Sequence, residues 1–359
     1  MRRLAFEPTF TPMSKAWYGG YKGDLIQATE LLAGARERAL GKDGQFQAFL
    51  AEINSEIPAQ FIFESNNIEG EGLPAGETKK LVLEEIAGDF SGLKSQIPGS
   101  EFDLLTADQS ISPPVSEWRS ALKMKGKAKE LSAVIGHLAA YLRMDARSKK
   151  ARYENHAQSV VKPRLLEPNL IKNLHLLLCM GNSNNDNGLP GHYRPRPACI
   201  DEKTVFLEPS LIENAMEYFF QNHYSRLSQL SYNPIIEACR VKEEFIKIHP
   251  FGDFNGRISR LMVGGFLKSE GYPILLILRS DPKDKKRYFD AMKACFRGNP
   301  TRLISLISKA IIRQIEGLNT RLELSGLEKI APMGISQEGE KRLNLDLQEF
   351  ERTCKNMLL

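Results

Sequence analysis

The residues best suited to chemistry lie together in one stretch, 248–263, which reads Ile-His-Pro-Phe-Gly-Asp-Phe-Asn-Gly-Arg-Ile-Ser-Arg-Leu-Met-Val. It combines an imidazole (His249), a carboxylate (Asp253) and two guanidinium groups (Arg257 and Arg260). An imidazole that titrates near neutral pH can act as the general base for a hydroxyl nucleophile. The carboxylate is placed to hold a divalent cation that would itself bridge phosphates.

The second half of the stretch predicts an anion site. If a helix begins near Asn255 or Gly256, its free N–H groups and the positive end of its dipole face whatever precedes it. Arg257 and Arg260 are three residues apart, so they share one face of the first turn and can bind successive phosphates. Together these groups indicate phosphoryl or nucleotidyl transfer. The residues alone leave another interpretation open, in which the histidine is a turn residue and the Asp-x-Asn-Gly turn only caps a helix with solvated charges.

The rest of the chain predicts a mainly helical protein with one small hairpin. Residues 1–22 have no periodicity and are expected to be an irregular arm, and 88–114 is expected to be a long loop or insertion. The segment 193–207 is the expected hairpin, an edge or flap because Pro195 and Pro197 suit a central strand poorly. Helices are expected over 22–40, 45–56, 58–70, 76–87, 118–147, 171–180, 209–222, 234–248, 256–269, 285–297, 301–324 and 337–357.

Composition limits the classes of function. The chain has 359 residues, 42% of them apolar, and a formal charge of +5, which is mild and argues against a nucleic-acid-binding protein. Five widely spaced cysteines form no C-x-x-C pair, so neither disulfides nor a zinc site are expected. No apolar run has the length of a signal peptide or a membrane span. We expect a cytoplasmic protein without a membrane partner, with secretion as an effector not excluded.

Residues 249–260 resemble the signature of the Fic (filamentation induced by cAMP) family, H-P-F-x-D/E-G-N-G-R-x-x-R, at every defined position but one. The resemblance covers about 165–315, and its further matches are Tyr193-Arg194, Glu270-Gly271-Tyr272-Pro273, Arg287-Tyr288-Phe289 and Asn299-Pro300. It implies a Fic-type helical bundle with a small β-hairpin flap. The expected organisation is an N-terminal helical region (1–112), connecting helices (113–164), the Fic core (165–315) and a C-terminal helical tail (316–359).

The same resemblance implies a protein adenylyltransferase. His249 would deprotonate a Ser, Thr or Tyr hydroxyl of a target protein, which attacks the α-phosphate of ATP and expels pyrophosphate. Asp253 would bind Mg²⁺, and Arg257 and Arg260 would hold the β- and γ-phosphates. The backbone around Asn255 and Gly256 would form the anion hole, Tyr288 would lie on the nucleotide side, and Phe251 would be core. The flap at 197–204 would receive a target segment as an added strand, although a purely structural hairpin is the alternative.

A second motif, Ser65-Asn66-Asn67-Ile68-Glu69-Gly70, resembles the family's inhibitory pattern S/T-x-x-x-E-G/N. It implies an inhibitory helix at about 57–70 in which Glu69 pairs with Arg260 and removes the partner of the γ-phosphate, with Ser65 and Gly70 as further regulatory positions. In some members the same glutamate positions a water molecule that removes AMP from a modified protein. De-AMPylation is therefore the alternative activity. Relatives with this layout are often homodimers.

The one departure from the signature is Phe254, which stands where the pattern has glycine. If the position needs positive φ, a bulky residue costs roughly 1 to 2 kcal/mol of strain. The backbone N–H survives, because phenylalanine is not proline. The departure leaves two outcomes open. One is a compromised nucleotide site, and with it a third function, a catalytically weak nucleotide-binding regulator. The other is a reshaped site in which the ring of Phe254 contacts the nucleotide or the inhibitory helix.

Overall fold

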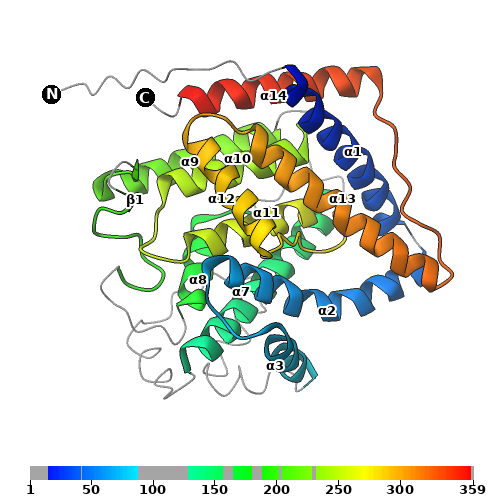
Figure 1. The fold of residues 1–359 in the computed structure, drawn as a ribbon, viewed down its shortest axis with the longest axis horizontal. Helices are drawn as coiled ribbons and strands as arrows, with labels where there is room; N and C mark the ends of the chain where they lie inside the picture. The colour runs from blue at the N-terminus through cyan, green and yellow to red at the C-terminus, as the bar shows by residue number, and fades with distance from the viewer. Residues whose placement is uncertain are drawn as a thin grey trace.

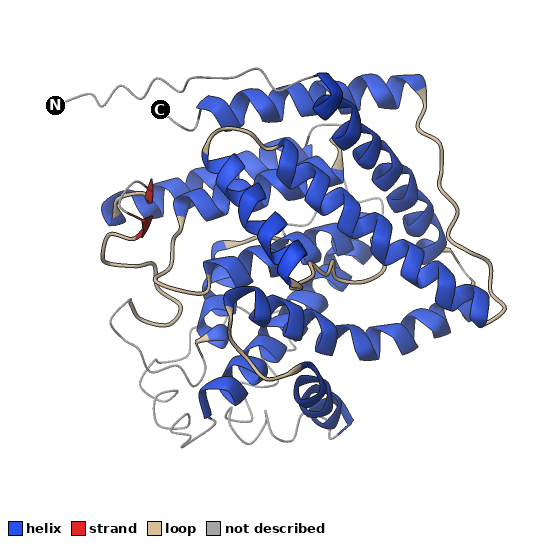
Figure 2. Ribbon diagram, viewed as in Figure 1, coloured by secondary structure: helices blue, strands red, loops and turns tan. Residues whose placement is uncertain are grey.

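The computed structural model describes residues 15–41, 43–87, 128–156, 165–179, 188–201, 204–228 and 232–356. Within them the chain forms a bundle of helices with one two-stranded antiparallel ladder at its periphery (Figures 1 and 2). The helices are α1 (Lys15–Leu40), α2 (Gly44–Glu69), α3 (Ala75–Ala87), α7 (Ala128–His156), α8 (Pro168–Leu178), α9 (Ile212–Ser228), α10 (Pro234–Ile248), α11 (Asn255–Ser269), α12 (Pro282–Phe296), α13 (Thr301–Leu324) and α14 (Gln337–Asn356), with the 3₁₀ turn η2 (Pro209–Leu211).

Helix α11 lies at the centre of the bundle (Figure 1). Every residue of α11 except Gly256 is buried, as expected for a helix surrounded by others. Helices α10 and α7 pack against it, α1 packs along α13, and α2 approaches the N-terminal end of α11. The first turn of α11, which carries the predicted anion site, is therefore the place where the N-terminal helices meet the core.

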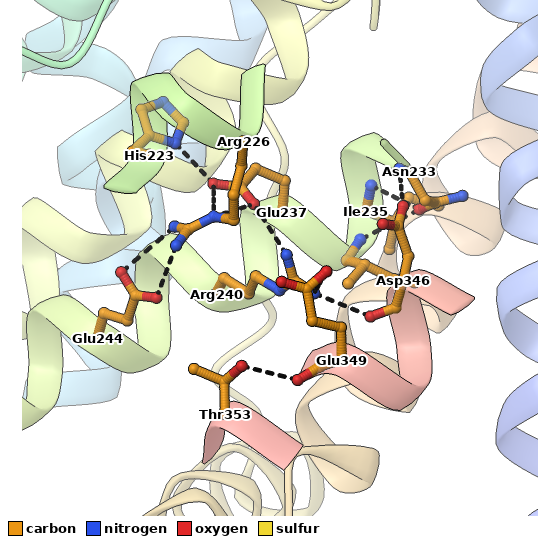
Figure 3. Close-up of polar contacts among 11 residues, drawn as sticks. His223, Arg226, Asn233, Ile235, Glu237, Arg240, Glu244, Asp346, Glu349 and Thr353 are labelled. Carbon is orange, nitrogen blue, oxygen red and sulfur yellow. Dashed lines mark hydrogen bonds and ion pairs between the residues drawn. The ribbon is translucent and has the colours of Figure 1, made fainter. Parts of the chain in front are cut away.

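Helix α10, which leads into His249, is held on two sides by polar contacts. Asn233 caps its start by accepting hydrogen bonds from the N–H groups of Ile235 and Ile236. A buried network joins α10 to α9, in which Oε1 of Glu237 lies 2.7 Å from Nδ1 of His223 and its Oε2 accepts a 2.8 Å bond from Arg226 (Figure 3). On the other side, helix α14 accepts a 2.9 Å bond from Arg240. These contacts fix the first half of α10, the helix that leads to His249.

Most predicted helices are confirmed, and the boundaries of α10 and α13 coincide with the predicted ones. The separate helices predicted over 45–56 and 58–70 were wrong, because α2 runs without a break through Pro58. Proline removes one internal hydrogen bond, at a cost of about 3 kcal/mol. The buried face of α2 continues at helical spacing on both sides of it and outweighs that cost: Phe46, Phe49, Leu50, Ile53, Ile57, Phe61 and Ile62.

Two further expectations need correction. Helix α1 begins at Lys15, so the end of the expected irregular arm is helical. The hairpin is shorter than 193–207: β1 (Cys199–Asp201) pairs with β2 (Thr204–Val205), and the proline-containing segment before β1 is not a strand. Proline lacks the N–H that a ladder needs. The expected loop at 88–114 and the start of the helix expected at 118 lie outside the described residues.

Candidate active site

His249 ends α10 in the left-handed conformation, with φ 51° and ψ 59°. Its ring stacks on Phe206, with centroids 3.7 Å apart and an interplanar angle of 10°. Burial, assisted by the positive charge of Arg194, lowers the pKa of His249 to about 4. The imidazole is therefore neutral near pH 7 and able to accept a proton.

The loop between α10 and α11 is held by its own side chains. The Nδ2 of Asn255 donates a 2.8 Å bond to the carbonyl of Phe251, whose N–H donates a 3.1 Å bond back to Oδ1. Phe251 is fully buried and stacks on His175 at 4.1 Å, so it is a core residue. Because the amide of Asn255 is used within the loop, only its backbone is available to an anion.

Phe254, the residue that departs from the signature, immediately precedes α11 with φ 64° and ψ 1°. The position does adopt positive φ, where a bulky residue is strained. The ring is only 6% exposed and packs beneath the guanidinium of Arg257, 4.0 Å from the ring centre. Its N–H donates a 2.6 Å bond to Oδ1 of Asp253. Phe254 thus offsets its backbone strain by packing, and its ring contacts one of the two predicted phosphate ligands.

Asp253 is the predicted metal ligand. Its side chain is 54% exposed, and its Oδ1 lies 3.9 Å from Nη2 of Arg257. No cluster of three or more His, Cys, Asp or Glu that could hold a metal occurs among the described residues. A single exposed carboxylate beside an anion site suits Mg²⁺, which commonly keeps several waters and takes its remaining ligands from substrate phosphates. The donor set therefore fits Mg²⁺ only together with a nucleotide.

Arg260 is bound to the end of α2. Its Nη2 donates a 2.7 Å bond to Oε1 of Glu69 and a 2.8 Å bond to the carbonyl of Ser65, and its Nε donates a 2.7 Å bond to Oγ of Ser65. Burial alone would raise the pKa of Glu69, but the charge of Arg260 outweighs it, so the pKa lies below its ordinary value. Gly70 then ends α2 with φ 78°, a left-handed conformation that favours glycine.

The carboxylate of Glu69 lies directly over the first turn of α11. A Cβ added to Gly256 would lie 2.4 Å from Oε1 of Glu69, a distance that no real contact tolerates. The carboxylate therefore lies beside the first turn of α11, at the predicted anion site, and Arg260 holds it there. The absence of a side chain at Gly256 is what allows this approach.

Two participants in the site were not predicted from the sequence. Oε2 of Glu71 accepts a 2.8 Å bond from Nη1 of Arg257, so the second arginine is also paired with a carboxylate. Lys242 is fully buried and donates to Oγ of Ser259 at 2.8 Å and to the hydroxyl of Tyr288 at 3.0 Å. A signal for Lys242 existed, because the apolar residues Cys239 and Phe245 lie three positions before and after it in the sequence, on the same face of a helix.

Tyr288, the predicted nucleotide-side residue, supports an arginine. Its hydroxyl accepts a 3.2 Å bond from Nη1 of Arg260 in addition to the bond from Lys242. Burial raises the pKa of Tyr288, but the charges of Lys242 and Arg260 outweigh this and lower it below its usual value. The predicted phosphate site thus has a third basic side chain, Lys242, behind its two arginines.

Comparisons with known proteins identify a family that part of the chain matches. Residues 165–267 match the model of the Fic/DOC family. Protein adenylyltransferase Fic of Aedes aegypti is 25% identical over 126 residues, which cover 35% of this chain and 22% of that protein. Protein adenylyltransferase Fic of Drosophila virilis is 26% identical over 162 residues, covering 44% and 29%. The chain thus spans less than a third of the length of these two relatives.

The chain is also similar to solved structures. Because their sequence identity to this chain is low, the similarity shows a shared fold and nothing further. A Fic domain containing signaling protein from Bacteroides thetaiotaomicron superposes with a TM-score of 0.55 at 18% identity, over 86% of this chain and all of the other. Fic-1 from C. elegans (residues 134–508) superposes with a TM-score of 0.54 at 16% identity, over 86% of this chain and 74% of the other. None of the described helices is long and apolar enough to cross a membrane. From the matched sequence and the central motif together, residues 165–267 form a domain of the Fic/DOC family.

Proposed function

We propose that the chain is a protein adenylyltransferase, transferring AMP from ATP to a Ser, Thr or Tyr hydroxyl of a target protein, and that Glu69 holds it inactive. The observation that carries the proposal is the carboxylate of Glu69, bonded to Arg260 and lying over Gly256 at the N-terminus of α11. A site in which a buried arginine binds a carboxylate beside a helix N-terminus has the chemistry to bind phosphate. The names of the relatives from Aedes and Drosophila support AMP transfer as the reaction.

In the proposed reaction, neutral His249 accepts the proton of the target hydroxyl. The oxygen then forms a bond to the α-phosphorus of ATP while the bond to the leaving oxygen breaks, and pyrophosphate departs. Arg257, Arg260 and the first N–H groups of α11 hold the β- and γ-phosphates. When bound through Asp253 and phosphate oxygens, Mg²⁺ would neutralise phosphate charge.

The autoinhibited state follows from competition for the same cations. With Glu69 on Arg260 and Glu71 on Arg257, both predicted phosphate ligands are paired with carboxylates. Each arginine side chain is 2% exposed. An incoming triphosphate would have to displace these carboxylates and would also be repelled by them. We infer that ATP binds productively only when the end of α2 moves or when Glu69 is removed.

The hairpin would supply the target site. Among the residues that the structure describes, β1 and β2 pair only with each other, so each has an outer edge to which an extended target segment could add as a strand. Val205 on β2 is 64% exposed. A target segment placed here would lie beside Phe206, whose ring stacks on His249.

De-AMPylation is the second candidate function, favoured by the position of Glu69 inside the site. Its side chain remains 29% exposed, so a carboxylate oxygen could hold a water molecule while Arg260 occupies the other side. The two reactions separate on one substrate: wild-type protein that releases AMP from an AMP-modified target, with the release lost in Glu69→Gly, would establish hydrolysis as the main activity. A nucleotide-binding regulator, the third candidate, predicts ATP binding without AMP transfer even in Glu69→Gly.

Mass spectrometry tests the proposal most broadly. Glu69→Gly protein would be incubated with ATP, Mg²⁺ and a cell lysate, and peptides would be searched for a 5′-AMP adduct on Ser, Thr or Tyr. The expected result is adducts that are scarce with wild-type protein and absent with His249→Ala in the same background. A Glu69→Gly protein that binds ATP but yields no adduct above the His249→Ala control would overturn the proposal and favour the regulator.

A further inference from the structure

Arg194 connects the hairpin to the histidine loop through four hydrogen bonds. Its Nε donates a 2.8 Å bond to the carbonyl of His249, its Nη1 donates a 2.8 Å bond to the carbonyl of Arg196, and its Nη2 donates to the carbonyl of Leu207. Its own N–H donates a 2.8 Å bond to the carbonyl of Pro250. Arg194 is 3% exposed. The buried guanidinium thus joins both ends of the hairpin segment to His249, and the backbone N–H of Arg194 adds a bond to Pro250.

The carbonyl that Arg194 binds belongs to a residue in an unusual conformation. His249 is one of two described non-glycine residues with positive φ, and it holds φ 51°. Left-handed residues need surrounding contacts to persist. The bond from Nε of Arg194 fixes the direction of the His249 carbonyl, and so restrains the backbone that aims the imidazole.

The hairpin also supplies one wall of the imidazole. Phe206 closes the base of the hairpin by donating its N–H to the carbonyl of Ala198 at 2.9 Å. Its ring lies flat on His249, 3.7 Å away. Leu207, the next residue, accepts the bond from Arg194. The side chain of Arg194 therefore holds both the backbone of His249 and the segment that carries Phe206, the stacking partner of His249.

We propose that Arg194 is a positioning residue for the base, in that it clamps the hairpin onto the histidine loop and thereby fixes the imidazole of His249 against Phe206. The hairpin, which would bind the target, and His249, which would be the base, are then held together by Arg194 and would move together. This inference rests on the proposed AMP transfer. Arg194 itself contacts neither predicted phosphate arginine in the described structure, so it acts on the proton-accepting group and leaves nucleotide binding alone.

Three variants separate clamping from charge. Arg194→Lys keeps the positive charge but cannot make the forked hydrogen bonds, and Arg194→Gln removes both the charge and those bonds. Arg196→Gln is the control on the same segment, because the side chain of Arg196 is exposed and only its carbonyl bonds to Arg194. Each is made in the full chain with Glu69→Gly. For both Arg194 variants we expect kcat of AMP transfer to fall about 10- to 100-fold with the Kd for ATP unchanged. A kcat no lower than that of Arg196→Gln would overturn the inference.

A second readout does not depend on activity. The titration of His249 can be followed by NMR on protein labelled at its six histidines, with the signal assigned from His249→Ala. The charged groups that act on this imidazole are Arg194, which lowers its pKa below the ordinary value, and Glu69, which raises it. Arg194→Gln should therefore raise the pKa, and a rise in Arg194→Lys would report an imidazole that has left its buried position. An unchanged titration in both variants would overturn the inference.

Failure of the proposed AMP transfer can be told apart from failure of the inference about Arg194. If Glu69→Gly transfers no AMP, the proposed function fails, and the titration still decides the role of Arg194. If the Arg194 variants do not fold, Phe206→Leu tests the same clamp from its other end, because it removes the stacked ring while leaving the Arg194 bonds to main-chain carbonyls. The expected result is a raised pKa of His249 and a lowered kcat; an unchanged pair of values would contradict the proposed clamp.

Discussion

Nη2 of Arg260 donates a 2.7 Å hydrogen bond to Oε1 of Glu69, although the two residues are 191 positions apart in the chain. The arginine side chain is 2% exposed and that of the glutamate 29%. Removing one partner of a buried ion pair leaves the other charge uncompensated, which strongly favours any replacement anion. The pair therefore connects the position of α2 to the anion affinity of α11.

The contact between Glu71 and Arg257 predicts a second, weaker element of inhibition. Glu71→Gln removes the charge that pairs with Arg257 at 2.8 Å and leaves Glu69 in place. We expect ATP to bind about 2- to 5-fold more tightly, because the Glu71 side chain is 28% exposed and solvent screens the pair. Calorimetry on the single and double variants checks this. A Glu69→Gly/Glu71→Gln protein that binds ATP no better than Glu69→Gly would exclude a contribution from Glu71.

The close approach of Glu69 to Gly256 predicts a specific coupling. Gly256→Ala places a methyl group 2.4 Å from Oε1 of Glu69, so the carboxylate must move from Arg260. We expect the free energy of unfolding to fall by about 1 to 3 kcal/mol in the wild-type background and by much less in Glu69→Gly. Urea denaturation of the four proteins of this cycle measures the coupling. Equal losses in both backgrounds would mean that the carboxylate does not lie over position 256.

Phe254 predicts opposite effects on stability and on nucleotide affinity. Phe254→Gly relieves roughly 1 to 2 kcal/mol of backbone strain but removes a buried ring worth about 3 to 5 kcal/mol, so the protein should be less stable by about 2 kcal/mol. The same change should tighten ATP binding, because the ring lies against the guanidinium of Arg257. Phe254→Leu, which keeps the strain and part of the packing, is the control. Equal ATP affinity in wild type and Phe254→Gly would show that the loop tolerates the ring.

The low pKa of His249 predicts a flat pH profile near neutrality. With its pKa lowered to about 4 by burial, the base is neutral above that value and is lost only as pH falls through it. An ordinary histidine with a pKa of about 6.5 would be only about one quarter neutral at pH 6. For Glu69→Gly protein at saturating ATP we expect kcat to change little from pH 8 to pH 6. A decline with an apparent pKa near 6.5 would mean that the imidazole is solvated or that another group is the base.

The sequence predicted the parts of the fold that depend on local signals. Helix α10 follows an Asn-Pro pair, which supplies a cap and a preset first turn, and its predicted boundaries match the observed ones. Whether position 254 needs positive φ could not be decided from the motif alone, and Phe254 is observed at φ 64°. The break predicted at Pro58 was wrong, because the packing of α2 against the core outweighs the proline, and such packing cannot be seen in a single segment.

The candidate site could be predicted only in part, for a related reason. The motif grouped His249, Asp253 and the arginines, because they are neighbours in the chain. The pairing of Arg257 with Glu71 spans 186 positions and depends on how the end of α2 approaches α11. Lys242 was missed because a lysine on an apolar face is usually at its edge, whereas this one is buried with Tyr288 and Ser259 as partners. Long-range pairs of this kind follow from tertiary structure and leave little local signal.

Transfer of label from ATP tests directly whether Glu69 holds an AMP-transferring site inactive and whether His249 is its base. Wild type, Glu69→Gly and Glu69→Gly/His249→Ala would be incubated with Mg²⁺ and ATP labelled at either the α- or the γ-phosphate, and protein-bound label would be counted. Glu56→Gln is the matched control, since Glu56 is also on α2 and also pairs with an arginine, Arg321, at 2.9 Å but away from the site. We expect Glu69→Gly to incorporate α-label at least about tenfold faster than wild type and Glu56→Gln, to incorporate no γ-label, and to lose incorporation when His249→Ala is added. Incorporation of α-label that is equal in wild type and Glu69→Gly, or that survives the loss of His249, would contradict the proposal.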